Sequence, residues 1–138
     1  MDRYDLTNCT LPPKWWQLAC AALENEPFDC DEFLETFKET YALCREYTTK
    51  DSIHRDMTEI IINASQFISA KLTTSDYELM AACELTNAML SHCFCESPKP
   101  APTDKGTWCL CRDDFEIDFS NPEDELTELQ KLLMLNGY

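Results

Sequence analysis

Apolar residues recur at spacings of three and four along most of the chain, which is the period of an amphipathic helix. The clearest run covers residues 51–72, where the spaced apolar side chains are Ile53, Met57, Ile60, Ile61, Ala64, Phe67, Ile68 and Leu72. Three consecutive isoleucines at 60–62 favour a strand by propensity. The length and the period of the run nevertheless predict a helix.

The same pattern predicts two helices before this one. A helix at 13–25 follows Pro12-Pro13, because proline suits a first helical turn, where its missing N–H would have no partner. A helix at 30–48 follows Asp29 as N-cap, with Glu32 placed as in a capping box. Each has one apolar face, formed by Trp15, Trp16, Ala19, Cys20 and Leu23 in the first and by Cys30, Phe33, Phe37, Tyr41 and Cys44 in the second.

Two further helices are expected towards the C-terminus. Ser75 precedes the fourth, and Glu78 completes a Ser-x-x-Glu capping box. Residues 77–90 are apolar on more than one face, which predicts the most buried helix of the fold. Asn121 is the expected cap of the last helix, with Pro122 at its first position.

These elements predict an all-α fold of about five helices, either an antiparallel helical bundle or a short HEAT-like stack. The 138 residues contain only two glycines, whereas β-hairpin turns usually require more. No internal repeat favours the stack. We expect one domain, with a four-helix body at 1–95, a proline-rich loop and acidic arm at 96–120 and a C-terminal helix at 121–138.

The charge of the chain restricts its partners. It has 26 acidic and 11 basic residues, a net charge of −15. A surface that binds nucleic acid or anionic lipid needs clustered lysine and arginine, so we expect neither nucleic acid nor membrane as a partner. The expected partner is a protein with a basic or amphipathic segment.

The location expected from the sequence is intracellular, cytoplasmic or nuclear. No apolar run reaches the length of a membrane span, and the N-terminus has no signal-peptide pattern. Cysteines in such a compartment are thiols or metal ligands. A secreted origin is the alternative, and two tripeptides match the glycosylation sequon, Asn8-Cys9-Thr10 and Asn63-Ala64-Ser65.

Two Cys-x-Cys pairs bracket the proline-rich loop and form the main candidate metal site. Four thiolates complete a tetrahedral zinc site, with His92 as a substitute for one of them. The candidate ligands are Cys93, Cys95, Cys109 and Cys111. A one-residue gap is tighter than the usual C-x₂₋₄-C, so disulfides and unligated thiols packed beside apolar neighbours remain alternatives. The other cysteines are expected to be small core residues.

Two sets of apolar residues are candidate partner contacts. Trp15 and Trp16 are adjacent, as in a binding hot spot, although we favour a role in covering the end of the core. In the acidic stretch 113–128, apolar residues alternate with acids and are suited to anchor in a partner that the acids steer: Phe115, Ile117 and Phe119. The alternative for this stretch is an arm that lies across the helices.

No catalytic motif is present, since the chain has no P-loop, no GxGxxG and no HExxH. Its two histidines, His54 and His92, do not match a known thiol–base pattern. The sequence therefore predicts a non-catalytic protein–protein interaction domain, as an adaptor, scaffold or regulator. A zinc-stabilised structural module is the alternative, and an enzyme is a lesser one.

Overall fold

The computed structural model describes residues 11–47, 55–95, 107–110 and 127–137. Within these ranges the chain forms five α-helices and no strand, which confirms the all-α class. The helices are α1 (Leu11–Leu23), α2 (Cys30–Cys44), α3 (Arg55–Ser69), α4 (Tyr77–Phe94) and α5 (Glu128–Leu135). The short 3₁₀ helices η1 (Arg45–Tyr47) and η2 (Ala70–Leu72) continue α2 and α3.

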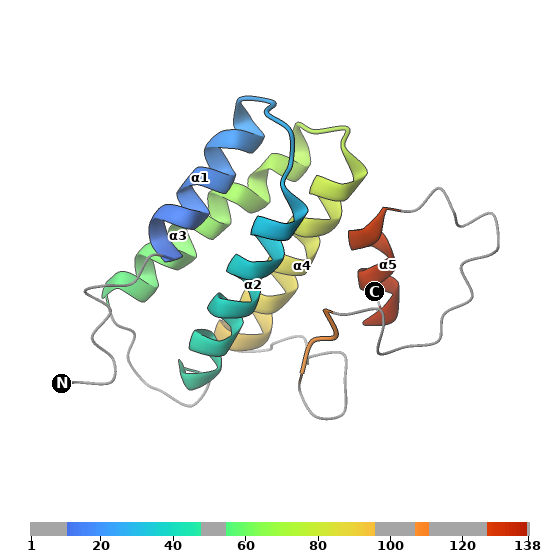
Figure 1. Cartoon of the computed structure of the whole chain (residues 1–138). Coiled ribbons are helices and arrows are strands. Elements are labelled where there is room, and N and C mark those ends of the chain that lie inside the picture. The colour runs from blue at the N-terminus through green and yellow to red at the C-terminus, as the bar shows by residue number, and fades with distance from the viewer. Residues whose placement is uncertain (1–10, 48–54, 96–106, 111–126, 138) are drawn as a thin grey trace.

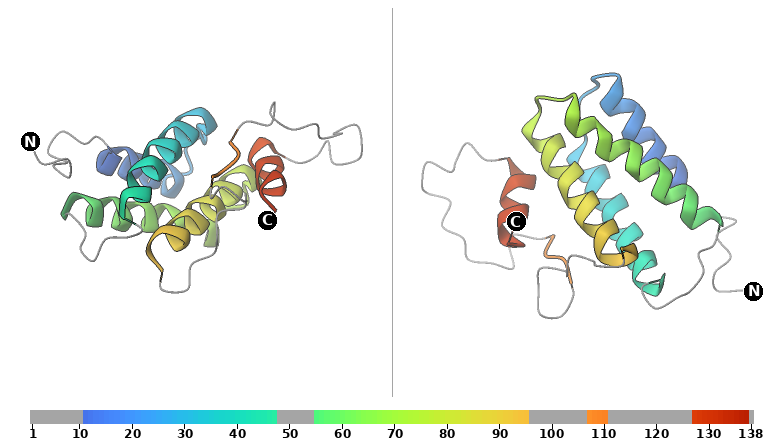
Figure 2. Two further views of the ribbon diagram at one scale, coloured as in Figure 1. Left: turned by 90° about the horizontal axis from the view of Figure 1, so that it is seen from below. Right: turned by 180° about the vertical axis from the view of Figure 1, so that it is seen from behind.

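The first four helices form two antiparallel hairpins that pack face to face. In Figure 1, α1 and α3 run in one general direction, and α2 and α4 return in the other. The views in Figure 2 place α1 and α2 in one layer and α3 and α4 in the second. Helix α1 contacts α3 most extensively, α2 contacts α4, and α5 lies against α4. These contacts are those of a helical bundle with a fifth helix attached to it.

Stacked and tilted aromatic rings join the two layers. Trp15 of α1, Phe33 of α2 and Phe67 of α3 are wholly buried. Their ring centroids are 5.7 to 6.1 Å apart. Burial of each such side chain stabilises the fold by roughly 1.5–3 kcal/mol. A polar contact adds to this joint, because the side-chain amide of Asn63 in α3 donates a 2.9 Å hydrogen bond to the carbonyl oxygen of Pro12 in α1.

Helix α4 is the centre of the bundle, as its sequence predicts. It contacts α3, α2 and α5, so it has buried residues on several sides. Three of these are alanines, which allow neighbouring helices to approach closely: Ala81, Ala82 and Ala88. Burial on several faces also explains why no single apolar stripe is visible in this part of the sequence.

Local signals account for the ends of α1 and the start of α2. Pro12 and Pro13 lie in the first turn of α1, which begins at Leu11, two residues before the predicted start. Asn25 adopts a left-handed φ of 58°, and the Glu26 N–H bonds back to Ala21 at 2.9 Å, as in a Schellman ending. The predicted cap of α2 is confirmed, since the Asp29 carboxylate accepts the N–H of Glu32 at 3.1 Å.

The predicted start of the fourth helix is wrong by one residue. Asp76, and not Ser75, is the N-cap of α4. Its carboxylate accepts the N–H of Glu78 at 2.9 Å and that of Leu79 at 3.4 Å. A carboxylate also interacts favourably with the positive end of the helix dipole, which a serine hydroxyl does less well. The expected Ser75–Glu78 capping box therefore does not form.

Within the described residues, the last helix begins at a cap that the sequence analysis did not identify. Thr127 has an extended backbone, with φ −70° and ψ 164°, and α5 begins after it. Thr127 and Gln130 form a reciprocal capping box, with hydrogen bonds of 3.0 and 3.2 Å. Asn121 and Pro122 lie outside the described residues.

Candidate partner-binding site

A pocket of about 220 Å³ lies where the end of α1, the α1–α2 connection and the start of α4 meet. Its apolar lining includes Leu18, Ala21, Ala22, Phe28 and Leu79. Its polar lining includes three exposed carboxylates, Glu26, Asp29 and Glu32. We call this feature the acidic pocket.

The shape of the acidic pocket follows from the local sequence. The left-handed turn at Asn25 ends α1, and Pro27 then leads the chain towards the cap at Asp29. Phe28 in this connection packs against the ring of Phe33 at 5.9 Å and that of Phe67 at 6.4 Å. The connection is thus held to the core by an aromatic side chain, and its acidic neighbours remain at the surface.

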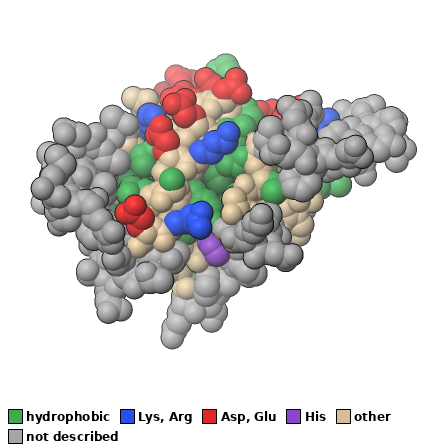
Figure 3. All heavy atoms as spheres, turned by 60° about the horizontal axis from the view of Figure 1, so that its bottom comes forward, with side chains coloured by type: hydrophobic (Ala, Val, Ile, Leu, Met, Phe, Trp, Pro, Cys, Tyr) green, Lys and Arg blue, Asp and Glu red, His purple; other side chains and the backbone are tan. Residues whose placement is uncertain are grey.

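The potential around this pocket is negative. Residues 15–37 contain no lysine, arginine or histidine. Six carboxylates between 24 and 35 are exposed, Glu24, Glu26, Asp29, Asp31, Glu32 and Glu35. The ion pairs seen in the described part of the chain, Lys14–Glu39 and Lys71–Glu84, involve none of these six. Figure 3 shows acidic side chains gathered along one edge of the face that it displays, next to exposed apolar surface.

The half-buried thiol of Cys30, the first residue of α2, lies near carboxylates of several helices. Burial raises the pKa of Cys30 to about 12, and a hydrogen bond with Glu78 and the charges of nearby carboxylates act in the same direction. These carboxylates belong to α2, α4 and α5. Carboxylates from three helices therefore lie near the start of α2. Their negative charge attracts a cationic partner.

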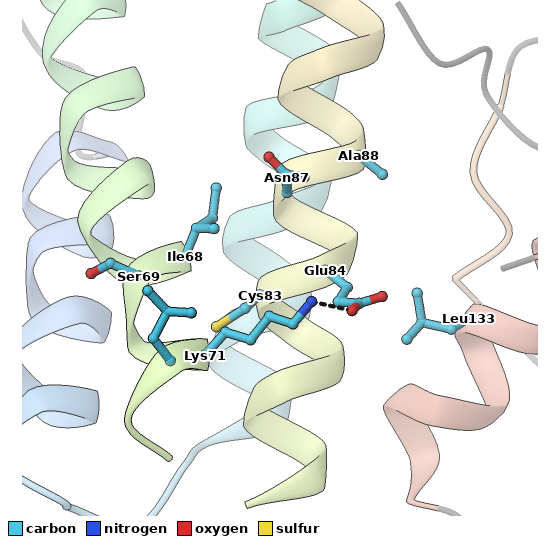
Figure 4. Close-up of a pocket in the computed structure, with 9 residues that line it drawn as sticks. Ile68, Ser69, Lys71, Cys83, Glu84, Asn87, Ala88 and Leu133 are labelled. Atoms are coloured by element: carbon cyan, nitrogen blue, oxygen red, sulfur yellow. Dashed lines mark hydrogen bonds and ion pairs between the residues drawn. The ribbon is translucent and has the colours of Figure 1, made fainter. Parts of the chain in front are cut away.

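A second pocket, of about 350 Å³, lies between η2, α4 and α5. Figure 4 shows Lys71 reaching across it to pair with Glu84, with Cys83 from α4 and Leu133 from α5 nearby. The Cys83 thiol donates to the carbonyl oxygen of Phe67 at 3.3 Å, so it is already engaged. Because Lys71 and Glu84 neutralise each other, this pocket does not favour a ligand of either charge. Leu72, which also lines the pocket, is 87% exposed.

The structure separates the two tryptophans that were predicted together as a partner contact. Trp15 is wholly buried, and its indole N–H donates a 2.8 Å hydrogen bond to Thr40 Oγ1 in α2. Trp15 is therefore a core residue, as the favoured interpretation of the pair expected, and its buried side chain is not accessible as a surface contact. Trp16 is 49% exposed and is accessible to a partner. Phe115, Ile117 and Phe119 lie outside the described residues.

The predicted zinc ligands are only partly described. Cys93 is buried, Cys95 is exposed and Cys109 is half-buried, whereas Cys111 lies outside the described residues. No three of the described histidine, cysteine, aspartate and glutamate side chains converge as a metal site requires. Zinc at the Cys-x-Cys pairs stays a prediction.

The two ends of the proline-rich loop do approach one another. The ring of Tyr41 in α2 lies 6.3 Å from that of His92 and 6.4 Å from that of Trp108. The residues next to Cys93 and Cys109 therefore contact the same side chain. Trp108 also packs edge-on against Phe37 at 5.8 Å, which makes it part of the core.

The thiol that contacts Cys93 belongs to a distant part of the sequence. The thiol of Cys44, the last residue of α2, donates a hydrogen bond to the Cys93 sulfur, and this bond raises the pKa of Cys44. The same bond lowers the pKa of Cys93, against the effect of burial and with help from the charge of Arg45. Cys44 was predicted only as a core residue, and no local signal links it to Cys93.

No protein-family model matches the chain, and no curated protein or solved structure resembles it at a significant level. Within the described ranges, each helix is too short or too polar to cross a bilayer. What the molecule can bind is therefore inferred from the geometry and charge of its own surfaces.

Proposed function

We propose that this protein is a non-catalytic interaction domain that docks a basic, amphipathic segment of a partner protein in the acidic pocket. The observation that supports this function is an apolar pocket bordered by exposed carboxylates that make no ion pair with any described residue. The apolar wall accepts an anchoring side chain, and Glu26, Asp29 and Glu32 face the cations beside it.

The size of the pocket suits this role. Pockets for small metabolites usually enclose about 300–1,000 Å³, and the acidic pocket is smaller. A single leucine- or phenylalanine-sized anchor fits better, with lysine or arginine neighbours over the rim. Exposed charges of this kind contribute mainly to the rate and specificity of association, so the buried anchor supplies most of the affinity.

The end of α1 adds to the preference for cations. The last turn of α1 contains no basic residue, so the negative end of its dipole is not neutralised from within the helix. Its carbonyl groups end beside Glu24 and Glu26. An anionic segment would meet repulsion from both the helix end and the rim.

A peptide selection tests the proposal and does not require that the partner be identified first. The full chain is screened against a displayed library of random 16-residue peptides, and enriched peptides are measured by fluorescence anisotropy. We expect a consensus with lysine or arginine flanking one or two large apolar residues, and affinity that falls as salt is raised. A selection that enriches no peptide, or that yields an acidic consensus, would contradict the proposed function.

Matched charge variants locate the binding surface. Glu26→Lys/Glu32→Lys should weaken the selected peptide about tenfold, which corresponds to ~1.4 kcal/mol. Glu46→Lys/Glu59→Lys makes the same change in net charge at exposed positions that do not line the pocket. Because salt screens charges at this distance from the pocket, this variant should change the affinity by less than about twofold. Equal weakening by both variants would mean that net charge, and not the pocket, determines binding.

A further inference from the structure

Helix α5 ends on an Asn-Gly pair whose two residues have separate structural roles. Gly137 adopts a left-handed φ of 79°, and its N–H donates to the carbonyl oxygen of Met134 at 3.0 Å. Glycine adopts this conformation without strain, which is why it commonly follows the end of a helix. Asn136 is the C-cap of α5, and only 3% of its surface is exposed. The ending of α5 thus accounts for both residues.

The side chain of Asn136 is fixed by three hydrogen bonds. Its oxygen accepts the N–H of Cys109 at 2.9 Å. Its nitrogen donates to the carbonyl oxygen of Cys109 at 2.8 Å and to that of Leu132 at 2.7 Å. Both polar atoms of the amide are therefore engaged, as is the N–H of Gly137, for as long as α5 stays packed on the bundle.

The same pair is chemically labile in an unfolded chain. Asparagine is among the thermolabile residues of proteins. It loses its amide most readily before glycine, because glycine has no side chain that hinders the approach of its backbone nitrogen to the asparagine side-chain carbon. Among the asparagines of the chain, only Asn136 precedes a glycine. The reactivity of the sequence and the hydrogen bonds of the fold therefore act in opposite directions at this position.

We propose that Asn136 is a deamidation site that packed α5 protects, and that deamidation prevents α5 from packing again once it has detached. Helix α5 has eight residues, too few for a stable isolated helix. It lies beside α4 at the edge of the bundle (Figure 1), so it can detach while the other four helices stay packed. Each detachment releases the Asn136 amide from Cys109. This site lies outside the acidic pocket and does not depend on the docking function.

The reaction requires water and no other reactant. The Gly137 nitrogen loses its proton and attacks the side-chain carbon of Asn136, the C–N bond of the amide breaks, and ammonia leaves with that proton. Water then opens the five-membered imide ring. Cleavage of the newly formed bond gives aspartate, and cleavage of the original backbone bond gives isoaspartate. In total one water is consumed and one ammonia is released.

Either product disfavours the packed position of α5. A carboxylate has no N–H, so the hydrogen bonds to the carbonyl oxygens of Cys109 and Leu132 are lost, and a negative oxygen faces them instead. Burial of a carboxylate without donors for its oxygens is costly. The new charge also lies at the negative end of the α5 dipole. Isoaspartate in addition inserts a carbon into the backbone at the end of the helix.

The first test compares the rate of deamidation in the folded and the unfolded chain. The full chain is kept under reducing conditions in mildly alkaline buffer, with and without guanidinium chloride, and the peptide that contains Asn136 is followed by mass spectrometry. A gain of one mass unit measures deamidation, and methylation by an isoaspartate methyltransferase measures isoaspartate. We expect a rate at least about tenfold lower in the folded chain. Equal rates, or no reaction in the unfolded chain, would overturn the proposal.

A packing variant tests whether detachment of α5 controls the rate. Leu129→Ala removes a wholly buried side chain of α5 other than Asn136, and should raise the rate without denaturant at least about fivefold. Ile62→Ala, at an exposed position of α3, should keep the original rate. The same rate in both variants would mean that the reaction does not require α5 to detach, and the proposed protection would be wrong.

A variant that carries the aspartate product tests the consequence of the reaction. Asn136→Asp should make hydrogen exchange in α5 at least about tenfold faster, with exchange in α3 unchanged. Asn25→Asp makes the same chemical change at an exposed position outside α5 and serves as the control. If α5 exchanges as slowly in Asn136→Asp as in the control, the product packs normally and deamidation does not keep α5 detached.

Discussion

The side-chain amide of Asn136 forms hydrogen bonds with both the backbone N–H and the backbone carbonyl oxygen of Cys109. Its oxygen accepts the Cys109 N–H at 2.9 Å, and its nitrogen donates to the Cys109 carbonyl oxygen at 2.8 Å. The same nitrogen donates to the carbonyl oxygen of Leu132 at 2.7 Å. A single buried side chain thus joins the end of α5 to the segment 107–110, whose Trp108 is in the core.

Removal of this amide should loosen α5. Asn136→Ala leaves the Cys109 backbone groups without their side-chain partners, and we expect a loss of about 2–3 kcal/mol in the free energy of unfolding. Hydrogen exchange should become faster in α5 before it does so in α4. Met134→Ala, at a half-exposed position of the same helix, serves as the control. A free energy of unfolding that is the same in Asn136→Ala and the control would show that the amide does not hold α5.

The two adjacent tryptophans should differ strongly in their effect on stability. Trp15→Ala empties a buried site in contact with Phe33 and Phe67, so we expect a loss of about 3–5 kcal/mol in urea unfolding. Trp16→Ala should change the free energy of unfolding by less than about 0.5 kcal/mol, because this side chain is exposed. Similar losses in the two variants would contradict the placement of α1 against α3.

The buried thiol of Cys83 should make the fold sensitive to alkali. Burial raises its pKa from 9.0 to about 12. The folded state therefore favours the protonated thiol, and the unfolded chain ionises first. The stabilising contribution is complete below about pH 9 and is lost between pH 9 and about pH 12, at no more than about 1.4 kcal/mol per pH unit.

Unfolding curves at several alkaline pH values measure this effect. Between pH 9 and pH 11 the free energy of unfolding should fall less steeply in Cys83→Ala than in the unmodified chain. Ile62→Ala, an exposed position without a titrating group, should keep the original slope. An unchanged slope in Cys83→Ala would assign the alkaline transition to other groups.

The zinc-module alternative makes a separate prediction. If the two Cys-x-Cys pairs bind zinc, protein purified from zinc-supplemented cells should contain about one zinc per chain and should melt at a lower temperature after chelation. Cys109→Ser should lower the zinc content, whereas Cys20→Ser should not. Less than about 0.2 equivalents of zinc, with a melting curve that a chelator does not change, would exclude the module.

Local signals were sufficient for much of the fold. The 3.6-residue period predicted α2 and α3. Asp29 could be identified as a cap because a capping side chain forms its hydrogen bond within the first turn of the helix that follows it. Where neighbouring residues carry similar signals, the sequence does not decide between them. Ser75 and Asp76 are both good caps, and only the path of the chain into α4 selects Asp76.

Features that depend on distant contacts were not predicted. Trp15 and Trp16 lie about 100° apart on α1, and only the packing of α1 on α3 and α2 decides that Trp15 is inside. The acidic pocket needs Leu79 of α4 beside the α1–α2 connection. Cys93 was assigned to a zinc pair from its neighbours in sequence, and its contact with Cys44 arises only when α4 packs on α2.

The pairing of α1 with α3 has a consequence for synthesis of the chain. The first hairpin leaves the ribosome before α3 exists, so Trp15 and Phe33 then lack the ring of Phe67, which lies 5.7 Å from each of them in the folded protein. A nascent chain of this length presents an uncovered aromatic surface to its surroundings. Translation rate and chaperone access during that interval should therefore affect the yield of this protein more than they affect a bundle whose successive helices cover one another as they emerge.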